Sequence, residues 1–209
     1  MSLGCPLHWG YLPAPRGAAP RRHALRGFTL IEAMIVLAVV ALLLALAVPS
    51  FREFVIRNRL DGASQEFLTS LQLARSEATR RGAQVTLRLA GAAGSKDWGS
   101  GWTMFVDADS DGVLDPAEEV IRQGMALQAP LSLVGSSNFD TWLAFNRDGR
   151  LTGDGGYFVL CDGGALTESG HSRSRAVLVN AAGRVRMAAR DGSSVPLTDA
   201  GAVSSCSNP

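Results

Sequence analysis

The chain of 209 residues has few cysteines and histidines, with three of each. Their spacing matches no zinc pattern, and no glycine-rich loop of the phosphate-binding type precedes an expected helix. His171 lies in an expected loop with several serines, which is a common chance arrangement. These absences argue against an enzyme and against a required cofactor.

The first 27 residues contain no aspartate or glutamate, although they carry Arg16, Arg21, Arg22 and Arg26. An apolar run follows from Phe28 to Val48, in which only Thr29 and Glu32 are polar. As a helix this run would be about 32 Å long, enough to cross the apolar core of a bilayer. The arginines predict that the N-terminus stays in the cytoplasm and that the rest of the chain crosses the membrane.

A cleaved signal peptide is the main alternative for this run, because Ala45-Leu46-Ala47 has the small-residue pattern of a signal peptidase site. Glu32 argues against it. A carboxylate inside a membrane segment costs roughly 2.5–3.5 kcal/mol on insertion scales, and a signal peptide does not need one. The position of Glu32 therefore indicates a retained segment in which this charge has a role.

The junction Gly27-Phe28-Thr29-Leu30-Ile31-Glu32 resembles the processing site of type IV pilins and type II secretion pseudopilins. The resemblance implies that a prepilin peptidase cuts after Gly27 and methylates the new N-terminal residue, Phe28. It also implies that the apolar helix is kept and joins other pilin or pseudopilin subunits in a filament. In such a filament Glu32 would neutralise the Phe28 ammonium of a neighbouring subunit, since buried charges are tolerated when they are paired.

Cleavage after Gly27 would change both the charge and the cysteine content. Loss of the four arginines leaves 16 basic against 19 acidic residues, a net charge of −3. Cys5 would leave with the leader, and the resulting head would lie in the periplasm, anchored to the bacterial inner membrane by a single pass. Cys161 and Cys206 would then be in an oxidising compartment, where we expect them to form a disulfide, with two free thiols as the alternative.

Beyond the membrane segment we expect the helix to continue through Pro49 to Arg81 and to be amphipathic from 49 to 81. Small and apolar residues repeat at spacings of three and four, which predicts one buried face: Ala63, Phe67, Leu71, Ala74 and Ala78. The opposite face is polar: Gln65, Glu66, Gln72, Arg75, Glu77 and Arg80. The arginines before Gly82 are typical of a helix C-terminus.

From residue 82 to 209 short β-type runs alternate with turn residues, which predicts one β-rich head in an α+β fold. The expected strands are Val85–Ala90, Trp102–Val106, Glu119–Gln123, Leu131–Val134, Trp142–Asn146, Tyr157–Cys161, Arg175–Val179 and Arg184–Ala188. We expect loops at Gly91–Ser100 and Asp162–Ser174 and an irregular tail at Ala189–Pro209.

Within the head, three segments resemble the GspH/FimT group of minor pilins and pseudopilins: 101–107, 118–122 and 179–186. The resemblance implies a type IV pilin-like fold with a long N-terminal helix packed on an antiparallel β-rich head. It also implies a position at or near the filament tip.

The turn after Trp102–Val106 carries Asp107, Asp109, Asp111, Asp115 and Glu118, with Gly112 at the sharp bend. This spacing fits an EF-hand calcium loop. The flanking segment is a strand and not a helix, and aspartate and glycine are also typical of hairpin turns. Both alternatives, a Ca²⁺ site and a plain hairpin turn, stay open.

Gly183-Arg184-Val185-Arg186 is a second candidate site, because Arg184 and Arg186 would project from the same face of a strand. In FimT-like proteins this element is associated with binding double-stranded DNA, and Arg173, Arg175 and Arg190 would extend the patch. With a net charge of −3, binding would depend on local clustering and on salt. The alternative is an ordinary hairpin with solvated arginines.

Three functions therefore compete on sequence. A FimT-like minor pilin with DNA binding is favoured by Arg184 and Arg186. A GspH-like minor pseudopilin of type II secretion shares the same fold and processing site. A membrane-anchored calcium-binding module outside any filament would require that Phe28 is not processed.

Overall fold

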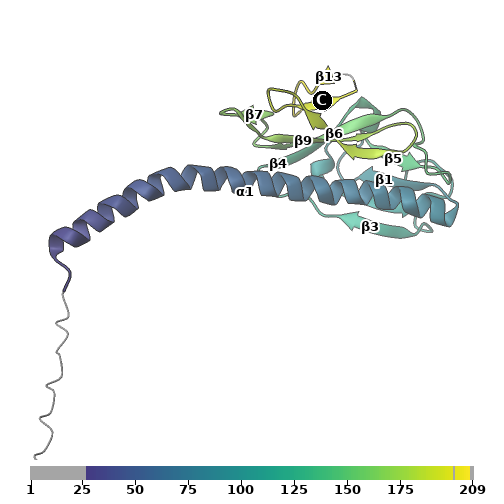
Figure 1. The fold of residues 1–209 in the computed structure, drawn as a ribbon. Coiled ribbons are helices and arrows are strands. Elements are labelled where there is room, and N and C mark those ends of the chain that lie inside the picture. Colours follow the sequence, from purple (N-terminus) through teal and green to yellow (C-terminus); the bar gives the residue numbers. More distant parts are fainter. Residues whose placement is uncertain (1–26, 200, 208–209) are drawn as a thin grey trace, which may run out of the picture. The chain divides into compact units, whose positions relative to one another are not determined.

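The computed structural model describes residues 27–199 and 201–207, so the leader arginines and Cys5 lie outside the described residues. The chain divides into two units, Met1–Ala45 and Leu46–Pro209. Helix α1, Leu30–Arg81, begins in the first unit and ends in the second (Figure 1). Among the described residues, α1 is the one helix with the length and apolar composition needed to cross a membrane.

In the first unit, Thr29 caps the start of α1. The Glu32 backbone N–H donates to Thr29 Oγ1 at 3.2 Å, and the Ala33 N–H donates to the Thr29 carbonyl oxygen. Glu32 lies in the first turn, where the positive end of the helix dipole stabilises a carboxylate. The large apolar side chains that follow are exposed, including Leu37 and Leu42.

In the second unit, α1 continues without interruption to Arg81, as predicted. Gly82 follows in a left-handed conformation (φ +65°), which glycine adopts without strain and which ends the helix. The expected inner face is confirmed, since Phe67, Leu71 and Ala78 are buried. Arg81 donates to both carboxylate oxygens of Glu119, at 2.6 and 2.8 Å, and so ties the last turn to the head.

The first four-stranded sheet has the order β3-β2-β1-β5, and all of its pairings are antiparallel. Its strands are β1 (Val85–Leu89), β2 (Trp102–Val106), β3 (Val120–Gly124) and β5 (Trp142–Phe145). These bounds lie within one residue of the sequence prediction, because short β-type runs bounded by turn residues define each strand.

The second four-stranded sheet has the order β10-β9-β6-β4 and is also antiparallel. Its strands are β4 (Leu131–Gly135), β6 (Gly156–Asp162), β9 (Ser174–Val179) and β10 (Val185–Met187). Strand β10 is shorter than predicted. Arg184 precedes it, in the turn where its N–H donates to Asn180 Oδ1.

Two segments expected to be irregular contain short strands, which corrects the prediction. The 162–174 loop holds a small hairpin, β7 (Thr167–Glu168) and β8 (His171–Ser172). The C-terminal tail forms a three-stranded sheet, β11 (Ala189–Arg190), β12 (Pro196–Thr198) and β13 (Gly201–Ala202). Short 3₁₀ turns, η1 (Trp98–Ser100) and η2 (Ser137–Phe139), complete the described elements. Strands this short have no sequence pattern of their own.

The main core lies between α1 and both four-stranded sheets. Phe158 is at its centre, with its ring centroid 4.8 Å from that of Phe67, 5.1 Å from that of Trp98 and 4.9 Å from that of Phe139. Leu71 from the helix and Leu87 from β1 are fully buried in the same cluster. The head is therefore built directly onto the C-terminal part of α1 (Figure 1).

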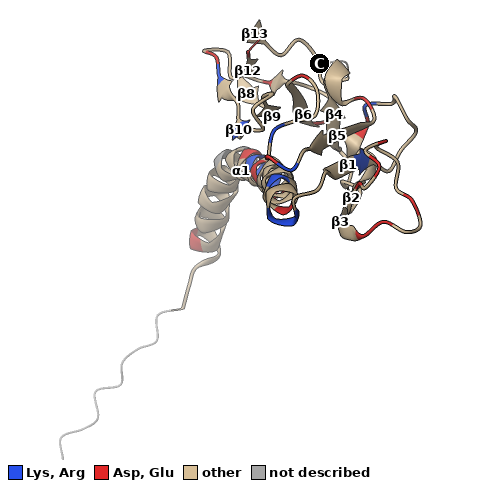
Figure 2. Cartoon of the chain, turned by 90° about the vertical axis from the view of Figure 1, so that its right-hand side faces the viewer, with Lys and Arg blue, Asp and Glu red and all other residues tan. Residues whose placement is uncertain are grey.

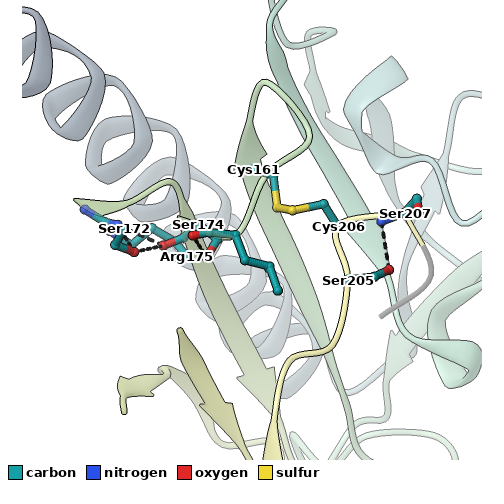
Figure 3. The surroundings of a disulfide bond; sticks show 8 residues. Cys161, Ser172, Ser174, Arg175, Ser205, Cys206 and Ser207 are labelled. Atoms are coloured by element: carbon teal, nitrogen blue, oxygen red, sulfur yellow. Dashed lines mark hydrogen bonds between the residues drawn. A yellow bond between two sulfur atoms is a disulfide. The ribbon is translucent and has the colours of Figure 1, made fainter. Parts of the chain in front are cut away.

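A second, smaller core covers the other side of β6 and β9. It contains Val159, Cys161 and Leu178 from the sheet and Val203 and Cys206 from the tail. The predicted disulfide is confirmed: Cys161 in β6 is bonded to Cys206, 45 positions along the chain (Figure 3). The tail is thus held on the sheet by a covalent bond and by apolar contacts.

Candidate functional site

The N-terminal candidates lie together at the start of α1. Gly27 and Phe28 precede the helix, and the Phe28 side chain is 80% exposed. Gly27 and Phe28 thus lie directly before a capped helix and outside any helix or strand. Thr29-x-x-Glu32 has the capping-box spacing, and the structure shows one half of that motif, the bond from the Glu32 backbone N–H to Thr29 Oγ1.

The acidic loop between β2 and β3 brings three of its five predicted ligands together. Carboxylate oxygens of Asp107, Asp109 and Glu118 all lie within 4.8 Å of one another. Asp111 lies outside this cluster, and its carboxylate accepts from the Val113 N–H at 2.6 Å. Asp115 is outside the cluster as well. Figure 2 shows acidic segments of this loop in red beside β3.

The electrostatics of the loop reflect this crowding. The backbone N–H of Asp111 donates to Asp109 and by itself lowers the pKa of the Asp109 carboxyl. Desolvation and the nearby carboxylates of Asp111 and Glu118 outweigh this effect, so that the pKa is raised overall. Negative charge therefore accumulates at Asp107, Asp109 and Glu118. One arginine reaches the same loop, since Arg88 Nη1 donates to the Gly112 carbonyl oxygen at 2.5 Å.

The two arginine candidates of the β9–β10 hairpin, Arg184 and Arg186, differ in position and in the groups that they contact. Arg184 is exposed at the turn, beside a surface cavity of about 650 Å³ that is also lined by Arg75 and Arg80 of α1. Arg186 lies in β10 and donates to Asp199 Oδ1 at 2.8 Å. The two arginines therefore do not form the single-strand pair that alternation predicts.

Arg173 and Arg175 do not extend an arginine patch, which corrects the prediction. Both are buried, with 6% and 4% of their surfaces exposed. Arg173 Nη2 lies 2.7 Å from Glu53 and Arg175 Nε lies 2.5 Å from Asp61, and both of these acids are on α1. These arginines hold the head on the helix.

Sequence reasoning missed these helix–head contacts. Arg173 and Glu53 are 120 positions apart, and Arg175 and Asp61 are 114 apart. The only signal was the presence of Glu53 and Asp61 near the start of the amphipathic half of the helix, where a solvated carboxylate is equally common.

Comparison with protein families gives two matches. The family described as "Type II transport protein GspH" matches residues 63–183, which is more than half of the chain. The motif described as "Prokaryotic N-terminal methylation motif" matches residues 22–48.

Similar proteins are pilin-like. The pilin-like protein PilA1 of Thermus thermophilus is 36% identical over 94 residues, which cover 45% of this chain and 56% of PilA1. The chain thus spans little more than half the length of this curated relative. The type IV minor pilin FimU of Pseudomonas aeruginosa is 27% identical in structure-based comparison, with a TM-score of 0.54, covering 73% of this chain and 98% of FimU. EpsH, a minor pseudopilin of the Vibrio cholerae Type 2 Secretion System, matches at 15% identity with a TM-score of 0.44, too weak for any inference.

Proposed function

The chain belongs to the GspH family, and from this premise we propose that it is a minor subunit of a type IV pilus-type filament, anchored in the inner membrane before assembly. The observation that carries the proposal is α1 itself. Its N-terminal part is apolar and exposed, with Glu32 as its one charge before Arg52, whereas its C-terminal part is covered by the head. Such a helix has an apolar surface available for other subunits.

Processing by a prepilin peptidase is the first step of this function and is directly testable. The intact mass of the membrane form is expected to lack residues 1–27 and to gain one methyl group on Phe28. Gly27→Leu is expected to keep the leader, because the cleaved bond follows Gly27. Gly62→Ala is a matched control, since a Cβ at Gly62 meets no atom within 4 Å. A wild-type protein that keeps its leader in membranes would favour an anchored module outside any filament.

We favour a type IV pilus over a type II secretion system because the likeness to FimU combines 27% identity with a TM-score of 0.54. Deletion of the gene, with natural transformation and protein secretion scored side by side, tests this choice. Loss of transformation with normal secretion is the expected result. The opposite pattern would identify a pseudopilin.

DNA binding at the β9–β10 hairpin is a second candidate function. It is favoured by the exposure of Arg184 and by its position beside Arg75 and Arg80 around one cavity. Together these side chains offer several cations to a phosphate backbone, although Arg80 is paired with Glu77 and Arg186 with Asp199.

A mobility-shift titration of the full chain in detergent with double-stranded DNA tests this function. The double substitution Arg184→Ala and Arg186→Ala is expected to weaken binding and to lower the salt dependence by about one unit per lost phosphate contact. Arg122→Ala, which removes a cation from the other sheet, is the matched control. Equal affinities of the double variant and the wild type would exclude this site.

A further inference from the structure

The carboxylate cluster of the β2–β3 loop contains one atom that its hairpin does not explain. Asp107 is 1% exposed, and its Oδ2 accepts three hydrogen bonds: from Thr86 Oγ1 at 2.6 Å and from Gln84 Nε2 and the Gly112 N–H, both at 3.1 Å. Its Oδ1 is buried and has no hydrogen-bond partner among the described residues. A buried carboxylate oxygen without a partner is unfavourable, and such atoms are rare unless an ion or a water meets them.

The Glu118 carboxylate is held in place close to the Asp107 carboxylate. Glu118 Oε1 accepts from the Ala108 N–H at 2.8 Å, and Glu118 Oε2 accepts from the Asp115 N–H at 3.0 Å. The next residue, Glu119, is fixed by Arg81 at the end of α1. The loop is therefore anchored at both ends, so that a ligand would not have to order it.

A plain hairpin turn accounts for part of the loop only. The carboxylates of Asp109 and Asp111 accept from backbone N–H groups two residues further on, which is the usual behaviour of aspartate in turns. This explanation does not account for the close approach of Asp107, Asp109 and Glu118. Three carboxylates within 4.8 Å repel one another unless a cation lies among them.

We propose that Asp107, Asp109 and Glu118 bind one divalent cation, calcium, in the β2–β3 loop. Calcium accepts six to eight oxygen ligands in irregular geometry, so that three carboxylates, loop carbonyls and water suffice. Magnesium is less suited, because it requires near-octahedral geometry. The dissociation constant is expected to be about 10⁻⁴ to 10⁻³ M, the range of extracellular calcium modules. The site does not depend on which filament the chain joins.

Calorimetric titration of the full chain in detergent, stripped with a chelator and then given CaCl₂, tests the proposal. Asp109→Asn and Glu118→Gln are expected to weaken binding at least about tenfold, since each removes one of three charged ligands. Asp115→Asn is expected to change it by less than about threefold, because Asp115 lies outside the cluster. Asp154→Asn, at an exposed acid elsewhere, is the control and should have no effect.

Asp107 itself is not the preferred test, because Asp107→Asn would also disturb three hydrogen bonds and the fold. Absence of saturable binding at about ten times the expected upper dissociation constant would overturn the proposal. Wild-type affinity in Asp109→Asn or Glu118→Gln would overturn it as well.

Terbium luminescence gives an independent location of the ion. The Trp142 indole lies against Gly112, where a Cβ would be 2.5 Å from Trp142 Cε2. Terbium in this loop should therefore be sensitised by Trp142 and displaced by calcium. Trp142→Phe is expected to remove most of the luminescence while calorimetric calcium binding persists. Full luminescence in Trp142→Phe would show that the metal binds elsewhere.

Discussion

The two faces of the second sheet are stabilised by different means. On the face toward α1, Phe158, Leu160 and Val177 pack into a large cluster rich in aromatic rings. On the opposite face, Val159 and Leu178 belong to a cluster of six buried residues, which is covered mainly by the short tail and closed by a disulfide. A small core buries little apolar surface and needs a covalent bond, whereas a large one does not.

The arginines follow the same division. Arg175 is on the helix side, buried and paired with Asp61, whereas Arg186 is on the tail side, half-exposed and paired with Asp199. Sequence reasoning placed Arg184 and Arg186 in a patch that Arg173, Arg175 and Arg190 would extend. The structure assigns Arg173 and Arg175 to the attachment of the head. It leaves Arg184 and Arg190 exposed and Arg186 partly exposed.

The largest expected loss of stability comes from removing a buried ring on the face of the second sheet that packs against α1. Phe158→Ala should lower the free energy of unfolding by roughly 3–5 kcal/mol, because a buried ring between Phe67 and Phe139 is removed. Val159→Ala, the next residue on the tail side, should cost about 1–2 kcal/mol. Urea denaturation of the full chain in detergent measures both, and an equal loss would remove the contrast between the faces.

Removal of the disulfide should have the next largest effect. Cys161→Ser with Cys206→Ser is expected to cost roughly 2–4 kcal/mol, since the bond closes a 45-residue separation. Hydrogen exchange should increase in residues 196–207 and leave the Phe158 cluster protected. A reductant should reproduce this in the wild type and do nothing to the double variant. Faster exchange throughout α1 would contradict the separation of the faces.

Removing Asp61 from its ion pair with Arg175 should destabilise the protein more than removing Arg175. Asp61→Ala is expected to lower the free energy of unfolding by about 2–3 kcal/mol. The Arg175 side chain is only 5% exposed, and this substitution leaves its guanidinium without a carboxylate partner. Arg175→Met should cost less, since methionine fills the buried space and Asp61, which is 55% exposed, is hydrated. Urea unfolding of the two variants compares them, and the reverse order would refute this account.

The smallest effect is expected at the tail side. Arg186→Ala and Asp199→Ala should each change the free energy of unfolding by less than about 0.5 kcal/mol, because the two side chains are 41% and 78% exposed. A double-mutant cycle in urea measures their coupling. A coupling above about 1 kcal/mol would show that this pair supports the fold in the way that Arg175 does.

Local pattern predicted the long helix and the eight strands of the two four-stranded sheets. Phe67, Leu71 and Ala78 recur at helical spacing, and Val85–Leu89 alternates, because each buried face imposes its own period. The short strands of the tail were missed because a strand of two or three residues is defined by its partner. Strand β12 exists through pairing with β11 and β13.

The candidate sites were predicted to different degrees for the same reason. The acidic loop lies within twelve residues, so its composition was visible, but which three of five acids converge depends on hydrogen bonds from Thr86 and Gly112. The roles of Arg173 and Arg175 depend on acids more than 100 positions away. Contacts at that distance in sequence have no local signature.

The disulfide also determines how the molecule would carry mechanical load. A force applied near the C-terminus would pass through the bond between Cys206 and Cys161 directly into β6, at the centre of the second sheet (Figure 3). The 44 residues between them, including the short tail strands, would bear none of it. From β6 the load reaches α1 through the ring of Phe158 and its contact with Phe67. Tension would therefore travel from one end of the head to the helix along a short path of covalent and tightly packed groups.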